Sequence, residues 1–346
     1  MTNETLSAQN RIDWVDYAKG ICIIAVVTMY STNFVEDNMQ ARGWMHYVVD
    51  FAQPFRMPDF FLIAGLFGSR VVHRSLRSFI DSKVLYFVYF YAIWVTLKFI
   101  NMQWHDLHGP ERLRLLVDYL TLYIQPPTGQ LWFIYMLPLF FISARMTQSI
   151  SPGLILAGAI VIALIDVHTG IKLLDKFCMY FVFFYSGFLF APQVFRMADW
   201  ARNNVHLTLF VLAAWFAANT IVVGLEWNFF PGMQLLMGYA GAVAILLLST
   251  VLAGIPWMQW LRYMGQHSIV IYLGFVIPLG IMRKFIVDYK LINDVGTASL
   301  TVMLVSVFGA LILYWSVRST PLRFLFVRPA WASIQTSQHF VVREDA

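Results

Sequence analysis

Long apolar segments recur along this chain of 346 residues, from residue 18 to residue 317, without a polar block large enough for a separate soluble domain. Crossing the hydrocarbon core of a bilayer takes about 20 apolar residues in a helix. Helices are the expected structure, because lipid offers no partners to backbone groups and the sequence lacks the alternating pattern of a membrane barrel. The sequence therefore predicts one integral membrane domain that is all-α.

Ten segments are apolar enough to be spans, which predicts a polytopic membrane protein of ten transmembrane helices. They lie near residues 18–35, 52–72, 84–101, 131–149, 153–168, 174–194, 206–225, 230–253, 268–288 and 298–317. The first is not a cleavable signal, because the run after Lys19 continues without a small-residue cleavage site. We expect a cytoplasmic segment over residues 1–17, the membrane domain over 18–317, and a cytoplasmic tail on the inner leaflet over 318–346.

Composition excludes the common soluble classes of enzyme. Hydrophobic residues make up 59% of the chain and charged residues 12%, about half the charged share of a soluble domain. Cys22 and Cys178 lie inside apolar runs, and signatures of phosphate loops, zinc proteases and serine hydrolases are missing from the sequence. His105 and His108 on an outer loop lack a third ligand, so we expect no metal and no bound prosthetic group.

Lysine and arginine residues set the expected orientation. With ten spans both termini lie on one side, and 14 of the 24 lysines and arginines fall there, which predicts cytoplasmic termini. The basic residues are spread over short loops without a basic stripe, so nucleic acid is not an expected partner. The densest group includes Arg74, Arg77 and Lys83, and it either contacts anionic membrane lipid or binds a phosphorylated donor.

Ionisable and polar residues inside spans indicate function, because their burial in lipid is unfavourable. Lys19 and Tyr30 lie eleven residues apart in the first span, so on one helix they are roughly 16 Å apart along the axis and nearly on one face. They either contact two groups of one long ligand or are a snorkelling lysine and an interfacial tyrosine.

Two further places carry polar groups at the outer ends of spans. Arg56 and Asp59 stand three residues apart around Pro58, so they either hold a site open as an ion pair or tie two helices together. Gln130 and Trp132 begin the fourth span after Gly129, where the amide offers hydrogen bonds. The indole either stacks on a sugar ring or belongs to the aromatic belt of the membrane.

Five stretches, in order, resemble motifs of acyltransferase family 3, the integral-membrane O-acyltransferases of bacterial cell-surface and secreted glycans. They are residues Trp14 to Val27, Arg56 to Gly68, Lys83 to Trp94, Gly129 to Ile134 and Tyr263 to Leu273. The second resembles the family's FF-x-x-SG-x-L segment with Ala64 before Gly65, the fourth its LWF motif, and the fifth its YIG-x-x-S-x-x-IYL motif. The resemblance covers nearly the whole chain.

This resemblance implies transfer of an acyl group, often acetyl, from a cytoplasmic acyl-CoA to a carbohydrate hydroxyl on the far side of a bacterial inner membrane. The family's first span carries a basic residue and, after ten intervening residues, a histidine; here these positions are Lys19 and Tyr30. A tyrosine with a pKa of about 10 is a poor general base at neutral pH, and losing such a base lowers the rate by about 10²- to 10⁴-fold. The family's RxxR motif corresponds to Lys83 and Tyr86, with Arg74 and Arg77 as a neighbouring alternative.

Three explanations of Tyr30 stay open. The chain is a substituted copy of an ordinary transferase, a natural member whose base lies elsewhere, with His46, Asp50 and Asp59 as candidates, or a scaffold that binds without turnover. A transporter or flippase for a lipid-linked sugar or small organic ion is the rival function, because intramembrane charges also line transport pathways.

The expected site follows from these assignments. Lys19 and Lys83, with Arg74 and Arg77, would meet the donor phosphates. The expected catalytic side chains are those of Tyr30, Arg56, Asp59 and Gln130. The expected acceptor-binding side chains are those of Ser31, His46 and Trp132. In this scheme Tyr30 and Ser31 supply hydrogen bonds, and Arg56 or Gln130 steadies the developing oxyanion. The sequence gives no indication of the oligomeric state.

Overall fold

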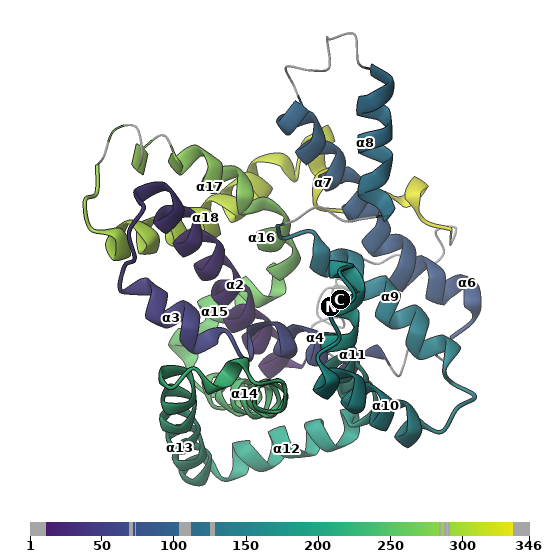
Figure 1. The fold of residues 1–346 in the computed structure, drawn as a ribbon, viewed down its shortest axis with the longest axis vertical. Coiled ribbons are helices and arrows are strands. Elements are labelled where there is room, and N and C mark those ends of the chain that lie inside the picture. Colours follow the sequence, from purple (N-terminus) through teal and green to yellow (C-terminus); the bar gives the residue numbers. More distant parts are fainter. Residues whose placement is uncertain are drawn as a thin grey trace, which may run out of the picture.

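A computed structural model describes residues 12–68, 72, 74–103, 112–124, 129–283, 285–286, 289 and 291–334. Throughout these ranges the regular structure is helical and contains no strand, which confirms the all-α prediction (Figure 1). The two histidines weighed as metal ligands, His105 and His108, lie outside the described residues, as do the first eleven residues and the last twelve.

Helices account for most of the described residues. In chain order they are α2 (Asp13–Met39), α3 (Met45–Ala52), α4 (Arg56–Leu66), α6 (Leu76–Phe79), the π-helical segment η1 (Ile80–Leu85), α7 (Tyr86–Gln103), α8 (Arg112–Ile124), α9 (Trp132–Met146), α10 (Pro152–Ile165), α11 (Lys172–Leu189), α12 (Ala191–Asn203), α13 (Val205–Gly224), η3 (Trp227–Phe229), α14 (Pro231–Leu252), η4 (Pro256–Met258), α15 (Gln259–Gln266), α16 (Ser268–Gly274), α17 (Val276–Arg283), α18 (Val295–Val317), η6 (Pro321–Leu325) and η7 (Ala330–Ala332).

Five helices in the described part of the chain are long and apolar enough to cross a membrane, and a bent pair makes a sixth. The five are α2, the continuous segment Leu76–Ile100, α13, α14 and α18. The pair is α11 with α12, which meet at an angle of 74°. The chain is therefore a multi-pass membrane protein, while ten spans and cytoplasmic termini stay predictions.

The other four predicted spans correspond to shorter or broken helices. α4 has 11 residues, α9 has 15 and α10 has 14, all below the length of about 20 that a perpendicular helix needs. The segment 268–288 is divided between α16 and α17, which meet around Phe275. Pro278 has no N–H to donate to the carbonyl of Gly274, which explains a break at this place.

α2 lies at the centre of the packing and contacts α4, α14, α15 and α18 (Figure 1). Small residues let these helices approach closely, as is common between membrane helices. A Cβ added to Gly65 of α4 would lie 2.0 Å from the carbonyl oxygen of Phe184 in α11, and one added to Gly187 of α11 would lie 2.1 Å from the carbonyl oxygen of Leu62. The backbones of α4 and α11 therefore touch, which fixes the side chains at their outer ends relative to each other.

The described part of the C-terminal tail packs on the protein. Phe326 is buried, the Trp94 indole donates to the carbonyl oxygen of Leu325 at 3.0 Å, and the Tyr89 hydroxyl donates to that of Phe324 at 2.9 Å. The sequence predicts that this tail lies on the inner leaflet. The structure shows two short 3₁₀ helices here, η6 and η7, of which η6 is anchored to α7, and the place of the tail relative to the membrane stays a prediction.

Candidate functional site

Lys19 and Tyr30 lie on one unbroken helix, because α2 runs from Asp13 to Met39. The axial separation of about 16 Å that the sequence predicts therefore applies. The Lys19 ammonium lies 5.9 Å from the ring centroid of Phe67, and the Tyr30 ring lies 5.4 Å from the ring of Phe275. One helix thus links the Lys19 cation to the half-buried phenol of Tyr30.

Around Tyr30 the structure gathers side chains from four separate helices. The Tyr30 hydroxyl lies close to the Trp132 side chain, and the Arg56 guanidinium is close enough to interact electrostatically with the hydroxyls of Tyr30 and Tyr180. The rings of Trp132 and Tyr180 stack with centroids 5.6 Å apart. The Lys176 ammonium lies over the Trp132 ring, 3.8 Å from its centroid. We name these five residues the outer cluster.

The sequence predicted Tyr30, Arg56 and Trp132 as site residues, and the structure brings these three together. It adds Lys176 and Tyr180, which sequence reasoning missed. Their signal was present, because the two residues stand four apart at the start of a predicted span and so share a helix face.

Gln130 lies at the start of α9, next to the outer cluster in sequence. Its side chain is buried, and its backbone carbonyl accepts a hydrogen bond from the Tyr272 hydroxyl. Gly129 precedes it with φ of 113°, a conformation that side chains disfavour, so a glycine is required at this turn. A Cβ added there would lie 3.2 Å from the Lys98 ammonium. The turn therefore brings the start of α9 close to a cation of α7.

Asp59 is separate from the outer cluster, which corrects the idea that it pairs with Arg56. Arg56 donates to the carbonyl oxygen of Val49 at 3.3 Å, whereas the Cys22 thiol approaches the Asp59 carboxylate at 3.8 Å. In the described part of the chain the two residues form no ion pair, because Asp59 faces α2 and α14 and lines a small cavity with Ala18 and Ala242. The second oxygen of this buried carboxylate has no hydrogen-bond partner among the described residues.

His46 belongs to a polar chain on the side of α3. Its Nδ1 lies 2.7 Å from a Glu36 carboxylate oxygen, and its Nε2 lies 3.4 Å from one of Asp50. Asp50 in turn interacts electrostatically with Arg56, so His46 is linked indirectly to the outer cluster. Ser31 is fully buried, and within the described residues its hydroxyl has no hydrogen-bond partner.

The predicted phosphate-binding residues differ in burial. Lys83 lies in η1 with an exposed fraction of 6%, and its ammonium is 5.1 Å from the Phe141 ring centroid. Phe141 also lies 3.5 Å from the position of a Cβ added to Gly68. Gly68 follows Phe67, and the Lys19 ammonium lies over the Phe67 ring. Lys19 therefore lies over Phe67, and Lys83 lies over Phe141, a ring that packs near Gly68.

Arg74 and Arg77 are exposed and stand outside this buried region. Arg145, which sequence reasoning missed, donates to the carbonyl oxygens of Val72 at 2.7 Å and Arg74 at 3.0 Å. It thereby holds the backbone of residues 72 and 74 against α9. A long-range contact to backbone carbonyls leaves no signal in the spacing of residues.

Comparison with known proteins agrees with the motifs. The family model described as an acyltransferase domain, that of acyltransferase family 3, matches residues 12–317, which is nearly the whole chain. No curated protein and no solved structure matches the chain.

Proposed function

The chain belongs to this acyltransferase family, and from that premise we propose that it moves an acyl group, acetyl by family resemblance, from cytoplasmic acyl-CoA to a carbohydrate hydroxyl across the membrane. The proposal includes ten spans, both termini in the cytoplasm, and a bacterial inner membrane as the location. The observation that carries it is the unbroken helix α2, which bears Lys19 near one end of the domain and Tyr30 inside the outer cluster.

The donor route follows α2 in this proposal. Lys19 and Lys83 meet the phosphates of the acyl-CoA in this scheme, because Lys19 lies over Phe67 and Lys83 lies over Phe141, which packs near Gly68. The pantetheine arm then extends along α2, and the thioester reaches the level of Tyr30. The axial distance of about 16 Å is of the order that separates the phosphates from the thioester of an extended donor.

Acyl transfer itself exchanges one bond for another. The acceptor hydroxyl oxygen attacks the thioester carbonyl carbon, an ester C–O bond forms, the C–S bond breaks, and the hydroxyl proton ends on the coenzyme A thiol. Negative charge develops on the carbonyl oxygen during attack, and the Arg56 guanidinium beside Tyr30 is placed to stabilise it. Trp132 and Tyr180 offer stacked aromatic faces on which a sugar ring can lie.

Tyr30 limits the rate in this scheme. A phenol can orient the acceptor hydroxyl by a hydrogen bond, but at neutral pH it removes a proton poorly. Trp132 and Arg56 both lie close to the Tyr30 hydroxyl. An imidazole at this position would therefore have the same two neighbours. The chain therefore retains the surroundings of a general base without the base.

Replacing Tyr30 by histidine tests the proposal. We expect Tyr30→His to raise transfer of label from radiolabelled acetyl-CoA to glycan in membrane vesicles by about 10²-fold, the lower bound for gaining a general base. Tyr30→Phe is the matched control, because it keeps the ring against Phe275 and removes only the hydroxyl. Equal transfer by all three proteins would remove Tyr30 from the site.

Binding of coenzyme A separates the proposed enzyme from the rival functions. A donor that binds the folded protein raises its thermal stability by mass action. We expect coenzyme A to stabilise the purified protein, whereas a transporter of lipid-linked sugar would show no such shift. Stabilisation by coenzyme A without transfer by either the natural chain or Tyr30→His would identify a binding-only member of the family.

A further inference from the structure

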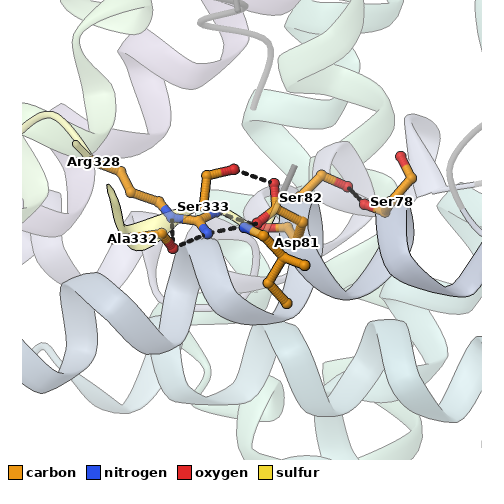
Figure 2. A network of polar contacts seen from close by, with 7 residues as sticks. Ser78, Asp81, Ser82, Arg328, Ala332 and Ser333 are labelled. Atoms are coloured by element: carbon orange, nitrogen blue, oxygen red, sulfur yellow. Dashed lines mark hydrogen bonds and ion pairs between the residues drawn. The ribbon is translucent and has the colours of Figure 1, made fainter. Parts of the chain in front are cut away.

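The C-terminal tail donates several hydrogen bonds to the buried carboxylate of Asp81. Asp81, in η1, has an exposed fraction of 1%. Arg328 donates through one guanidinium nitrogen to the Asp81 carboxylate at 2.6 Å and through another to the Asp81 backbone carbonyl at 2.7 Å (Figure 2). The Ser333 hydroxyl and the Ile334 N–H complete the set at 2.9 and 2.8 Å. We name Asp81, Arg328, Ser333 and Ile334 the tail clasp.

Both partners of this ion pair are tied on a second side. Arg328 also donates to the carbonyl oxygen of Ala332, which closes the tail into a compact turn (Figure 2). Both Asp81 oxygens accept hydrogen bonds from the tail. A buried ion pair is favourable only when such additional hydrogen bonds satisfy its remaining groups, and here they do. The tail clasp is therefore an ordered contact between segments about 250 residues apart in the chain.

The segment that the tail clasp holds is π-helical. A π-helical turn is wider and rarer than an α-helical one, and it occurs frequently at functional sites. The π-helical segment Ile80–Leu85 contains Asp81 and, two residues later, Lys83. Residues two apart on a helical turn point to nearly opposite sides. Fixing Asp81 against the tail therefore fixes Lys83 on the other side, where its ammonium lies against Phe141.

We propose that the tail clasp is part of the donor site and that Arg328 is a positioning residue, which orients Lys83 toward the phosphates of coenzyme A through Asp81. The proposal rests on the proposed function, because that function assigns the donor phosphates to Lys83. It gives the tail a role in recognising the donor, in addition to its anchoring on α7.

Equilibrium binding of coenzyme A and of pantetheine, which lacks the phosphates, tests this role. We expect Arg328→Ala to raise the dissociation constant for coenzyme A about tenfold, the effect of losing one charge-assisted contact, and Lys83→Gln to do the same. Binding of pantetheine should change in neither variant. A general loss of packing would weaken both ligands alike, so the ratio of the two constants isolates the contact with phosphate.

Guanidinium ion supplies a second readout. Added guanidinium should restore coenzyme A binding to Arg328→Ala by filling the place of the lost side chain, whereas sodium chloride at equal concentration should not. Arg323→Ala is the matched control, because Arg323 is an exposed arginine of the same tail segment and lies in η6 outside the tail clasp. It should bind coenzyme A as the natural chain does.

Arg328→Ala leaves a buried carboxylate unpaired and can fail to fold. The double variant Asp81→Asn with Arg328→Gln removes both charges together and keeps the test available. Unchanged coenzyme A binding in every folded tail variant, beside a tenfold loss in Lys83→Gln, would overturn the inference and leave the proposed function standing. Failure of the natural chain to bind coenzyme A would instead overturn the proposed function, and the inference with it.

Discussion

The tail clasp and the outer cluster hold their cations in different ways. In the tail clasp, Arg328 meets a carboxylate, Asp81, with its fork of donors engaged by the Asp81 oxygens and a tail carbonyl. In the outer cluster, Lys176 lies over the face of Trp132, and Arg56 lies near the hydroxyls of Tyr30 and Tyr180. In the first arrangement protein oxygens occupy the nitrogens of the cation. In the second, Lys176 lies against an aromatic face and Arg56 lies near two hydroxyls.

This difference indicates different uses of charge. A guanidinium whose three nitrogens are all engaged by the protein organises structure, and removing its partner exposes an uncompensated charge. A cation above an aromatic ring is attracted by the ring face and keeps N–H groups for a further partner. We therefore assign the tail clasp to positioning and the outer cluster to contact with reacting groups.

Removing Arg56 tests this division most severely. We expect Arg56→Ala to lower the rate of acyl transfer by about 10²- to 10³-fold, as loss of a donor to a developing oxyanion does. Coenzyme A binding should be unchanged, because the phosphates are assigned to the other end of α2. The measurement compares transfer of radiolabelled acetyl with the dissociation constant for coenzyme A.

Arg56→Lys is the control for charge alone. It keeps a cation but loses the planar fork of donors, so we expect a rate between those of the natural chain and Arg56→Ala. A large loss of coenzyme A binding in either variant would show that Arg56 acts on the donor phosphates and would remove the distinction between the two ends.

Sequence reasoning reached the class of fold and part of the outer cluster for identifiable reasons. Apolar length predicts membrane helices, and eleven residues of one helix place Lys19 and Tyr30 on one face. The sequence did not show that Arg56 and Asp59 contact different partners. A spacing of three residues on a helix allows an ion pair, but it does not tell which neighbouring helices each side chain contacts. It also could not show the tail clasp, since Asp81 and Arg328 are brought together only by tertiary packing.

The crossing of α4 and α11 provides a second test of the outer cluster, because it holds Arg56 of α4 close to Tyr180 and Lys176 of α11. A Cβ at Gly65 would lie 2.0 Å from a backbone oxygen of α11. We expect Gly65→Ala to lower the free energy of unfolding by about 1–3 kcal/mol, the usual effect of overpacking. Thermal unfolding of the purified protein measures this change.

Gly158→Ala is the matched control, because it lies in α10 with nothing within 4 Å of the added Cβ. A glycine inside a helix is less favourable than alanine, so this variant should gain about 0.5–1 kcal/mol. Folded Gly65→Ala should lose acyl transfer while coenzyme A binding persists. Equal stability in the two variants would show that α4 and α11 separate without effect, contrary to the packing of the outer cluster.

Lys176 gives the smallest and most specific test. Its ammonium lies 3.8 Å from the centroid of the Trp132 ring, and a contact of this kind contributes about 0.5–1 kcal/mol. We expect Lys176→Met, which keeps a long apolar chain over the indole, to lower acyl transfer about threefold, in line with that energy. Coenzyme A binding should stay constant. Lys172→Met removes a charge one turn earlier on α11 from an exposed position and should leave transfer unchanged. Equal loss in both variants would mean that the helix contributes only its overall charge, whereas loss confined to Lys176 would place the acceptor beside Trp132.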